Sequence, residues 1–407
     1  MRGFLATSIG VAVSTALALP LAPPSGDSKT PPPPAAETPG VPGSTRSLPL
    51  APQPTGRTVA PPSEHGRFER RVAPFSMAGV VWDDPGAELH GTVEIRTRAT
   101  ATRLWSGWQS VETHNHEHGA DPDTPESRSA RGSTAPLWVG RSDGVEVRVR
   151  PERGAPRPLP RGLRLELVDP GDGSGAVRAP ANRQAAGRPG MPAPDALPEQ
   201  AAAKPYIGPR PKIVTRKGWK ASESLRERGF VYSKTVKAAF VHHSATGNGY
   251  TCKQAPSVLR GIYRYHVVSS GWRDIGYNFA VDKCGNVYEG RAGGVTKAVR
   301  GAHTLGFNTN SMGIAVLGSY GRSNPPAAAV TGVARLTAWK LGLFKGNPQG
   351  KVTLTSGGSG KYAKGRKVRF NVISGHRDGF YTECPGARLY GRLGTARKAS
   401  AGYQGRV

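Results

Sequence analysis

The C-terminal half of this 407-residue chain offers six residues that could bind a metal: His242, His243, His266, His303, His376 and Cys384. His376 and Cys384 lie eight residues apart in the stretch ISGHRDGFYTECPG, residues 373–386. Zinc prefers imidazole and thiolate ligands, and a catalytic zinc site uses three of them and keeps the fourth position for water. The spacing alone is compatible with zinc, and equally with an inert buried cysteine beside a loop histidine.

These candidate ligands follow predicted strands. The run KAAFVHHSA predicts a buried strand that ends at His242 and His243, whose side chains point to opposite faces, so only one can join a given site. The run KVRFNVISGHRD predicts a last strand that leads into His376. Further apolar runs between them predict helices at 255–270 and 327–344, a hairpin at 277–291 and a strand at 311–320. This alternation predicts an α/β domain with a mixed central β-sheet flanked by helices over residues 209–403.

The N-terminal half has a different pattern. Residues 66–169 contain short alternating runs, such as LHGTVEIRTRA and GLRLELVDP, separated by Gly, Pro and Asp, which predict a smaller all-β sandwich. Residues 26–65 are Pro-rich, and residues 170–208 lose the alternating pattern, so both are predicted to be linkers. Residues 1–25 are predicted to be a signal peptide, because Arg2 precedes an apolar run that is shorter than the ~20 residues of a membrane span. We therefore expect an exported chain with no transmembrane segment after processing.

The chain carries a formal net charge of +28, from 56 Lys and Arg against 28 Asp and Glu. The basic residues are scattered, no helix-turn-helix or zinc-finger spacing is found, and basicity alone reads no bases. We therefore predict no specific nucleic-acid partner. For an exported protein, we expect anionic cell-wall polymers or membrane surfaces as partners; the alternative is that the charge only confers solubility.

A second group of histidines lies in the N-terminal half. His114, His116 and His118 alternate in ETHNHEHGADPD, followed by Asp121 and Asp123. In a strand, this alternation would align three imidazoles as in a metal site. Asn, Gly, Asp and Pro surround them, however, and the composition favours an exposed loop.

Four segments in the C-terminal half, taken together, resemble a known family. FVHHSAT, GWRDIGYNFAVDKCGNVYEGRAGG, GAHTLGFNTNSMGIAVLG and SGHRDGFYTECPG occur in this order between residues 240 and 386. They resemble the zinc-dependent N-acetylmuramoyl-L-alanine amidases of the peptidoglycan recognition protein family. The resemblance covers residues 209–403 and not the sandwich. It implies that His242, His376 and Cys384 bind Zn²⁺.

The resemblance also implies roles for four further residues. Tyr277 matches a tyrosine that faces the zinc-bound water. Thr382 stands where some relatives have a lysine, which leaves open whether it polarises the scissile carbonyl or only lines the pocket. His303 and His266 match positions that line the glycopeptide groove, and for His266 the alternative is a structural helix histidine.

With Cys384 assigned to zinc, the other two cysteines, Cys252 and Cys284, are expected to form a disulfide, the default for a remaining pair in an exported protein. Two free thiols are the alternative.

The activity implied by the resemblance is hydrolysis of the amide between N-acetylmuramic acid and L-alanine in peptidoglycan, by a secreted, cell-wall-associated enzyme. One alternative is a peptidoglycan-binding recognition protein of the same fold that does not hydrolyse. Family members that lack the cysteine lose the zinc and only bind, so Cys384 favours the enzyme. Another alternative is a basic adhesion or scaffold protein in which the sandwich carries the function.

Overall fold

The computed structural model describes residues 41–53, 64–69, 71–113, 116–152, 158–172 and 206–406, all within one compact unit, Pro34–Val407. The predicted signal peptide lies outside these residues, as do most of the two predicted linkers. Within the described ranges, no helix combines the length and the apolarity needed to cross a membrane.

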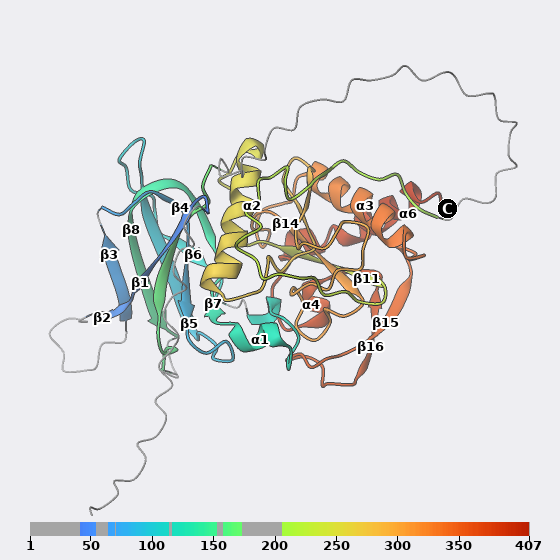
Figure 1. Cartoon of the computed structure of the whole chain (residues 1–407), viewed down its shortest axis with the longest axis horizontal. Helices are drawn as coiled ribbons and strands as arrows, with labels where there is room; N and C mark the ends of the chain where they lie inside the picture. Colours follow the sequence, from blue (N-terminus) through green and yellow to red (C-terminus); the bar gives the residue numbers. More distant parts are fainter. Residues whose placement is uncertain are drawn as a thin grey trace, which may run out of the picture. The chain divides into compact units, whose positions relative to one another are not determined.

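The N-terminal domain is all-β, as predicted (Figure 1). Nine described strands form one antiparallel sheet in the order β1-β9-β4-β8-β3-β2, with β5 paired to β8, β6 to β5 and β7 to β4. The 15-residue strand β8 connects two parts of this sheet, because β4 pairs with its first residues, whereas β3 and β5 pair with its later residues. The strands are β1 (Ser44–Pro49), β2 (Ala51–Gln53), β3 (Glu64–Glu69), β4 (Phe75–Trp82), β5 (Gly91–Ala99), β6 (Gln109–Val111), β7 (Gly132–Ser133), β8 (Leu137–Pro151) and β9 (Arg164–Asp169).

The start of this domain differs from the prediction. Strands β1 and β2 lie within residues 26–65, which the sequence analysis assigned to a linker. Strand β1 pairs with β9 over six residues, from Ser44 opposite Asp169 to Pro49 opposite Arg164. Both strands are at the edges of the sheet, where a proline is tolerated because its missing N–H is not needed for pairing. The Pro-rich composition therefore concealed two edge strands.

The C-terminal domain has the predicted α/β architecture. A six-stranded sheet has the order β10-β13-β12-β14-β11-β17, and its pairs are parallel except β12 with β13. Its strands are β10 (Ile213–Val214), β11 (Ala238–His243), β12 (Phe279–Val281), β13 (Val287–Glu289), β14 (Ser311–Val316) and β17 (Ile373–Gly375). Strand β11 is buried along its whole length, as expected for a parallel strand covered on both faces.

Helices pack on both faces of this sheet. α3 (Ala327–Gly342) and α6 (Leu393–Tyr403) contribute to the core on one side, and α2 (Ala255–Arg264) contributes to a second core. The π-helical turn η3 (Tyr265–Ser269) continues α2, and η2 (Cys252–Gln254) precedes it. The remaining elements are α1 (Pro125–Ser129), α4 (His376–Gly379), α5 (Ala387–Tyr390), η1 (His116–His118) and the two-stranded sheet of β15 (Lys351–Thr355) and β16 (Lys367–Asn371).

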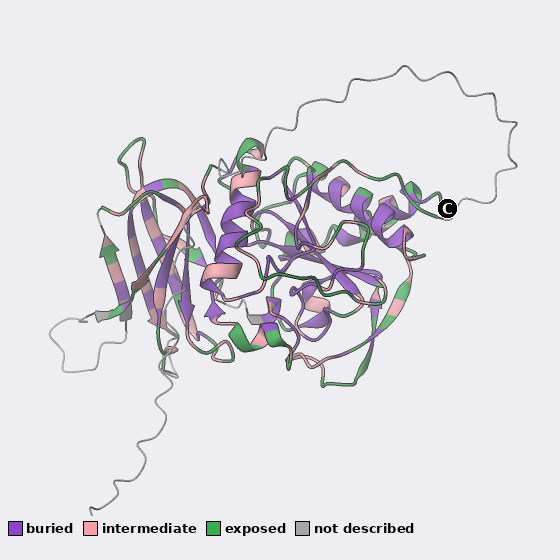
Figure 2. Cartoon of the chain, viewed as in Figure 1, coloured by how far each residue is buried: buried purple, intermediate pink, exposed green. Residues whose placement is uncertain are grey.

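The two domains share the core that contains α2. Side chains from β4, β8 and β9 belong to the same buried cluster as side chains from α2 and η3: Met77, Val81, Trp138 and Val168 with Val258, Ile262 and Tyr265. The contact is close at Gly79, where a Cβ would lie 2.5 Å from the Tyr265 hydroxyl. Figure 2 shows α2 buried along most of its length. The β-domain and the α/β domain are therefore packed together through apolar side chains.

Cys252 and Cys284 form the predicted disulfide, which links η2 to the turn between β12 and β13 across 32 residues. Replacing both by serine should lower the free energy of unfolding by about 3–4 kcal/mol, because the unfolded chain regains the loop entropy that the bond removes. Denaturant unfolding of the Cys252→Ser/Cys284→Ser protein, beside the wild type, measures this difference. An unchanged unfolding midpoint would contradict the expectation.

Candidate metal centre

The three predicted ligands lie together at the ends of two neighbouring strands. His242 is the second-last residue of β11, and His376 directly follows β17, which pairs with β11 through Val241 and Gly375. The chain then turns back, with the Arg377 N–H donating to the Cys384 carbonyl at 3.0 Å. A potential ligand atom of each of the three side chains lies within 4.8 Å of the others. Adjacent parallel strands thus bring both imidazoles and the thiol to one edge of the sheet.

His242 is held in a defined orientation. Its Nδ1 lies 3.7 Å from Cys384 Sγ, and its Nε2 lies 3.3 Å from His303 Nδ1 and 3.4 Å from Thr304 Oγ1. One ring nitrogen therefore faces the thiol while the other is fixed by protein partners. Metal-binding histidines typically show this arrangement, because the partner of the second nitrogen sets the tautomer and the ring orientation.

The chemistry of the three donors fits a zinc ion. Burial lowers the pKa of both His242 and His376 well below the ordinary value, so the imidazoles are neutral, which is the form that binds metal. Within the described residues, His376 Nδ1 is buried and has no hydrogen-bond partner. Burial also raises the pKa of the Cys384 thiol, and a bound cation would reverse this by stabilising the thiolate.

Tyr277 and Thr382, the two predicted catalytic residues, adjoin these ligands. Tyr277 precedes β12, its ring centroid lies 5.4 Å from that of His242, and burial raises its pKa well above the ordinary value. Its phenol therefore keeps its proton. Thr382 Oγ1 accepts a hydrogen bond from the Cys384 N–H at 3.1 Å, which positions the loop that carries the thiol. Their catalytic roles stay predictions.

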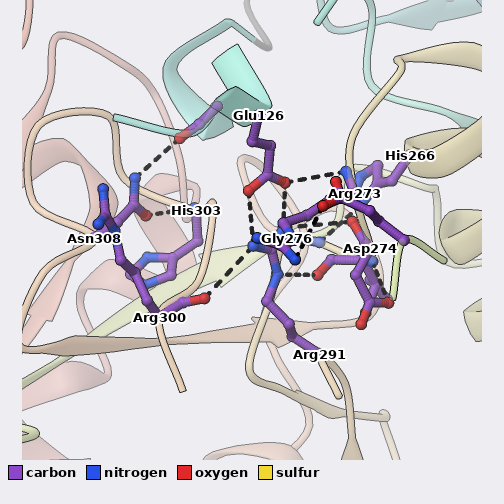
Figure 3. Close-up of polar contacts among 12 residues, drawn as sticks. Glu126, His266, Arg273, Asp274, Gly276, Arg291, Arg300, His303 and Asn308 are labelled. Atoms are coloured by element: carbon purple, nitrogen blue, oxygen red, sulfur yellow. Dashed lines mark hydrogen bonds and ion pairs between the residues drawn. The ribbon is translucent and has the colours of Figure 1, made fainter. Parts of the chain in front are cut away.

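His303 and His266, the predicted groove residues, are both buried. The His303 ring contacts His242 and packs so closely on Gly313 that a Cβ there would collide with it. His266 Nδ1 accepts a hydrogen bond from the Gly276 N–H at 3.2 Å, next to Tyr277 (Figure 3). In this structure both rings contact protein, and their contact with a substrate stays a prediction.

Comparison with known proteins decides the family. The family described as N-acetylmuramoyl-L-alanine amidase matches residues 232–387, and one described as Rv3811 N-terminal galactose-binding domain-like matches residues 33–184. The peptidoglycan-recognition protein SC2 of Drosophila melanogaster is 34% identical over 184 residues, which are 45% of this chain and 85% of that protein. This chain belongs to the peptidoglycan-recognition protein family.

Two further proteins are similar to part of this chain. The human N-acetylmuramoyl-L-alanine amidase is 34% identical over 140 residues, which are 34% of this chain and 20% of that protein. The solved structure of Drosophila PGRP-LB is 24% identical, with a TM-score of 0.36, and the match covers 45% of this chain and 93% of that chain.

In this peptidoglycan-recognition protein, a third histidine, His118 of the β-domain, lies at the candidate metal centre. His118, in η1, is 5% exposed, and its ring centroid lies 4.5 Å from that of His376 and 5.2 Å from that of His242. A potential ligand atom of His118 belongs to the same group within 4.8 Å as those of His242, His376 and Cys384.

The prediction of an exposed loop was therefore wrong for His118, and also for Asp121, which is buried. It holds for Asp123, which is exposed. His114 and the side chain of His116 lie outside the described residues. The alternation of the histidines in the sequence did indicate a metal site. The polar residues around them favoured a loop instead, because the partners that bury Asp121 and Glu126 lie far away along the chain.

Residues 116–131, which we call the covering segment, hold His118 in place. Asp121 Oδ1 accepts from the Gly306 N–H at 2.9 Å and from Asn308 Nδ2 at 2.8 Å. The Glu126 carboxylate accepts two hydrogen bonds from the Arg291 guanidinium, at 2.6 and 3.0 Å (Figure 3). Buried, charge-assisted contacts therefore attach the segment to the α/β domain on the C-terminal side of His118.

A cavity of about 640 Å³ lies beside the centre, between the two domains. Val93 and Val111 of the β-domain line one side, and Phe380 and Thr382 of the α/β domain line the other. Glu112 also lines the cavity, and its carboxylate oxygen lies 3.1 Å from His243 Nε2. His243 does not belong to the group of side chains that could share a metal ion, as its place next to His242 on the strand predicts.

Proposed function

We propose that this protein is a zinc-dependent N-acetylmuramoyl-L-alanine amidase, which hydrolyses the amide between N-acetylmuramic acid and L-alanine in peptidoglycan. The observation that carries the proposal is the buried Cys384 thiol, 3.7 Å from Nδ1 of His242, with His376 in the same cluster. Membership of the peptidoglycan-recognition protein family supports the substrate class. A binding module without hydrolysis is the second candidate, and the thiol favours the enzyme because such a module has no need of a metal ligand.

Each residue of the site would have a separate role. Zinc bound by His242, His376 and Cys384 would act as a Lewis acid on a carbonyl and would lower the pKa of a bound water towards neutrality. Tyr277, whose phenol stays protonated, can donate a hydrogen bond to the oxygen that becomes negative as the amide is attacked. A well-placed donor of this kind contributes about 3–4 kcal/mol. His303 fixes the second nitrogen of His242 and so keeps the metal-facing nitrogen in place.

We also propose that the protein acts outside the cell, at the cell wall. The predicted signal peptide and the disulfide support export. The net charge of +28 would attract the chain to anionic wall polymers, and added salt would weaken this attraction.

Digestion of purified peptidoglycan tests the activity. The zinc-loaded protein should release stem peptides with a free N-terminal alanine, detected by mass spectrometry, and leave glycan strands without peptide. Chelation of the metal should stop the release, and added zinc should restore it. Peptidoglycan is also treated in parallel with the Glu126→Ala protein, which lacks the ion pair that holds the covering segment. If neither protein releases peptide but both sediment with the wall, the binding module is the correct function.

A further inference from the structure

We propose that His118 is a fourth protein ligand of the metal, so that the chain in this conformation is a latent form whose metal centre is closed. This inference rests on the proposed function, since it concerns the same zinc site. His118 comes from the β-domain, within residues 33–184 that match the galactose-binding domain-like family and outside the amidase match at 232–387.

Four side chains at the site could each donate to one metal ion. His118, His242, His376 and Cys384 each offer a ligand atom, all within 4.8 Å of one another. Three imidazoles and one thiolate satisfy the tetrahedral preference of zinc completely. Structural zinc sites are closed by four protein ligands in this way, whereas catalytic sites keep one position for water. With His118 as a ligand, the position that hydrolysis requires is occupied by protein.

The groups that would react with a substrate are buried. His242 and His376 have no exposed surface, Cys384 is 1% exposed and His118 is 5% exposed. Tyr277, the proposed oxyanion donor, is 4% exposed. A glycan with its peptide therefore cannot reach the reacting groups in this conformation without displacing the covering segment.

Hydrogen bonds and an ion pair attach the covering segment to the α/β domain. Contacts hold the chain on both sides of His118: the Glu117 carbonyl accepts from the Leu305 N–H at 2.9 Å, and the Asp121 carboxylate accepts from Gly306 and Asn308. Glu126 pairs with Arg291, and the Arg131 N–H donates to the Ser270 carbonyl at 2.9 Å. Because the chain is fixed on both sides of His118, this residue has little freedom to turn its ring elsewhere.

The polar nature of these contacts allows release. Separating a buried ion pair returns both charges to water, so the pair adds little net stability to the closed state. The apolar contacts between α2 and the β-domain, in contrast, lose free energy in proportion to the apolar area that they expose. The covering segment can therefore leave the metal centre at a smaller cost than the domains can separate.

Cobalt substitution tests the inference on the full chain. The visible spectrum of Co²⁺ reports the coordination of the metal, and azide occupies any open position. The spectrum of wild-type Co²⁺ protein should not change with azide, whereas that of His118→Ala should change, and this variant should bind zinc at least ~10-fold more weakly in a chelator competition. His118→Gln, which keeps more of the side-chain volume, repeats the measurement if the alanine variant does not fold.

His90→Ala is the matched control, because it removes a histidine of the same domain that lies outside the metal cluster. It should behave as the wild type. A wild-type spectrum that responds to azide as His118→Ala does would overturn the inference and leave the proposed amidase intact. Failure of the wild type to bind either metal would overturn the inference together with the proposed function.

Discussion

Replacing Cys384 by serine should abolish both zinc binding and peptidoglycan hydrolysis, with the fold intact. A serine hydroxyl does not ionise near neutral pH and is a poor ligand for zinc, so the centre loses its only anionic donor. Loss of groups that merely orient a ligand lowers metal affinity by about 10–100-fold. Loss of the thiolate itself should exceed this, because the negative charge that offsets the dication disappears.

Elemental analysis of the purified variant measures the zinc, and mass spectrometry of digested walls measures the hydrolysis. The Cys252→Ser/Cys284→Ser protein is the matched control, since it loses two sulfur atoms outside the metal centre and should keep its zinc. Full zinc content and full activity in Cys384→Ser would show that the ligand assignment is wrong.

Replacing Glu126 by alanine should release the covering segment. Glu126 and Arg291 are buried, with side chains 9% and 5% exposed, and the Glu126 carboxylate also accepts from the Arg273 N–H at 3.3 Å. Removal of one partner from a buried ion pair costs about 3–5 kcal/mol, because the other charge stays buried without compensation. Arg291 can regain water when the segment opens, so this cost favours the open state. The open population should rise by roughly 10² to 5 × 10³-fold.

Hydrogen exchange measured by mass spectrometry reads this opening directly. In Glu126→Ala, exchange should accelerate in residues 116–131 and at Leu305 and Gly306, whose N–H groups donate to the segment, while β11 stays protected. Arg128→Ala alters an exposed residue of the same helix and is the control. Equal protection of the segment in wild type and Glu126→Ala would show that the ion pair does not hold it.

Much of the metal centre could be predicted from the sequence because strands organise it. The apolar run before His242 and the strand before His376 are local patterns, and parallel pairing then fixes their ends at one edge. Cys384 required the resemblance to a family, since a His and a Cys eight residues apart fit several structures. The hairpin carrying Cys284 was also local and was predicted correctly.

His118 could not be placed in this way. Its position depends on Asp121 reaching Asn308, 187 residues away, and on Glu126 reaching Arg291, 165 residues away. No local pattern encodes such pairs, and the polar run around His118 is typical of loops. The shared core was missed for a related reason: Met77 and Trp138 appear in the sequence as ordinary apolar residues of strands, with no sign of which helix they would contact.

The shared core between α2 and the β-domain also determines how the metal centre could open and close. Because the β-domain stays fixed, the covering segment would remain attached at both ends, to β6 at Val111 and to β7 at Gly132, which pairs with Trp82. A displaced His118 would then compete with substrate for the open position on the metal. Because the covering segment is a short tether, the effective concentration of His118 near that position would be high. Reclosure would be independent of protein concentration, and hydrolysis would end whenever the wall fragment leaves. Such a chain would act only while it is engaged with its substrate, with no need for a separate inhibitor.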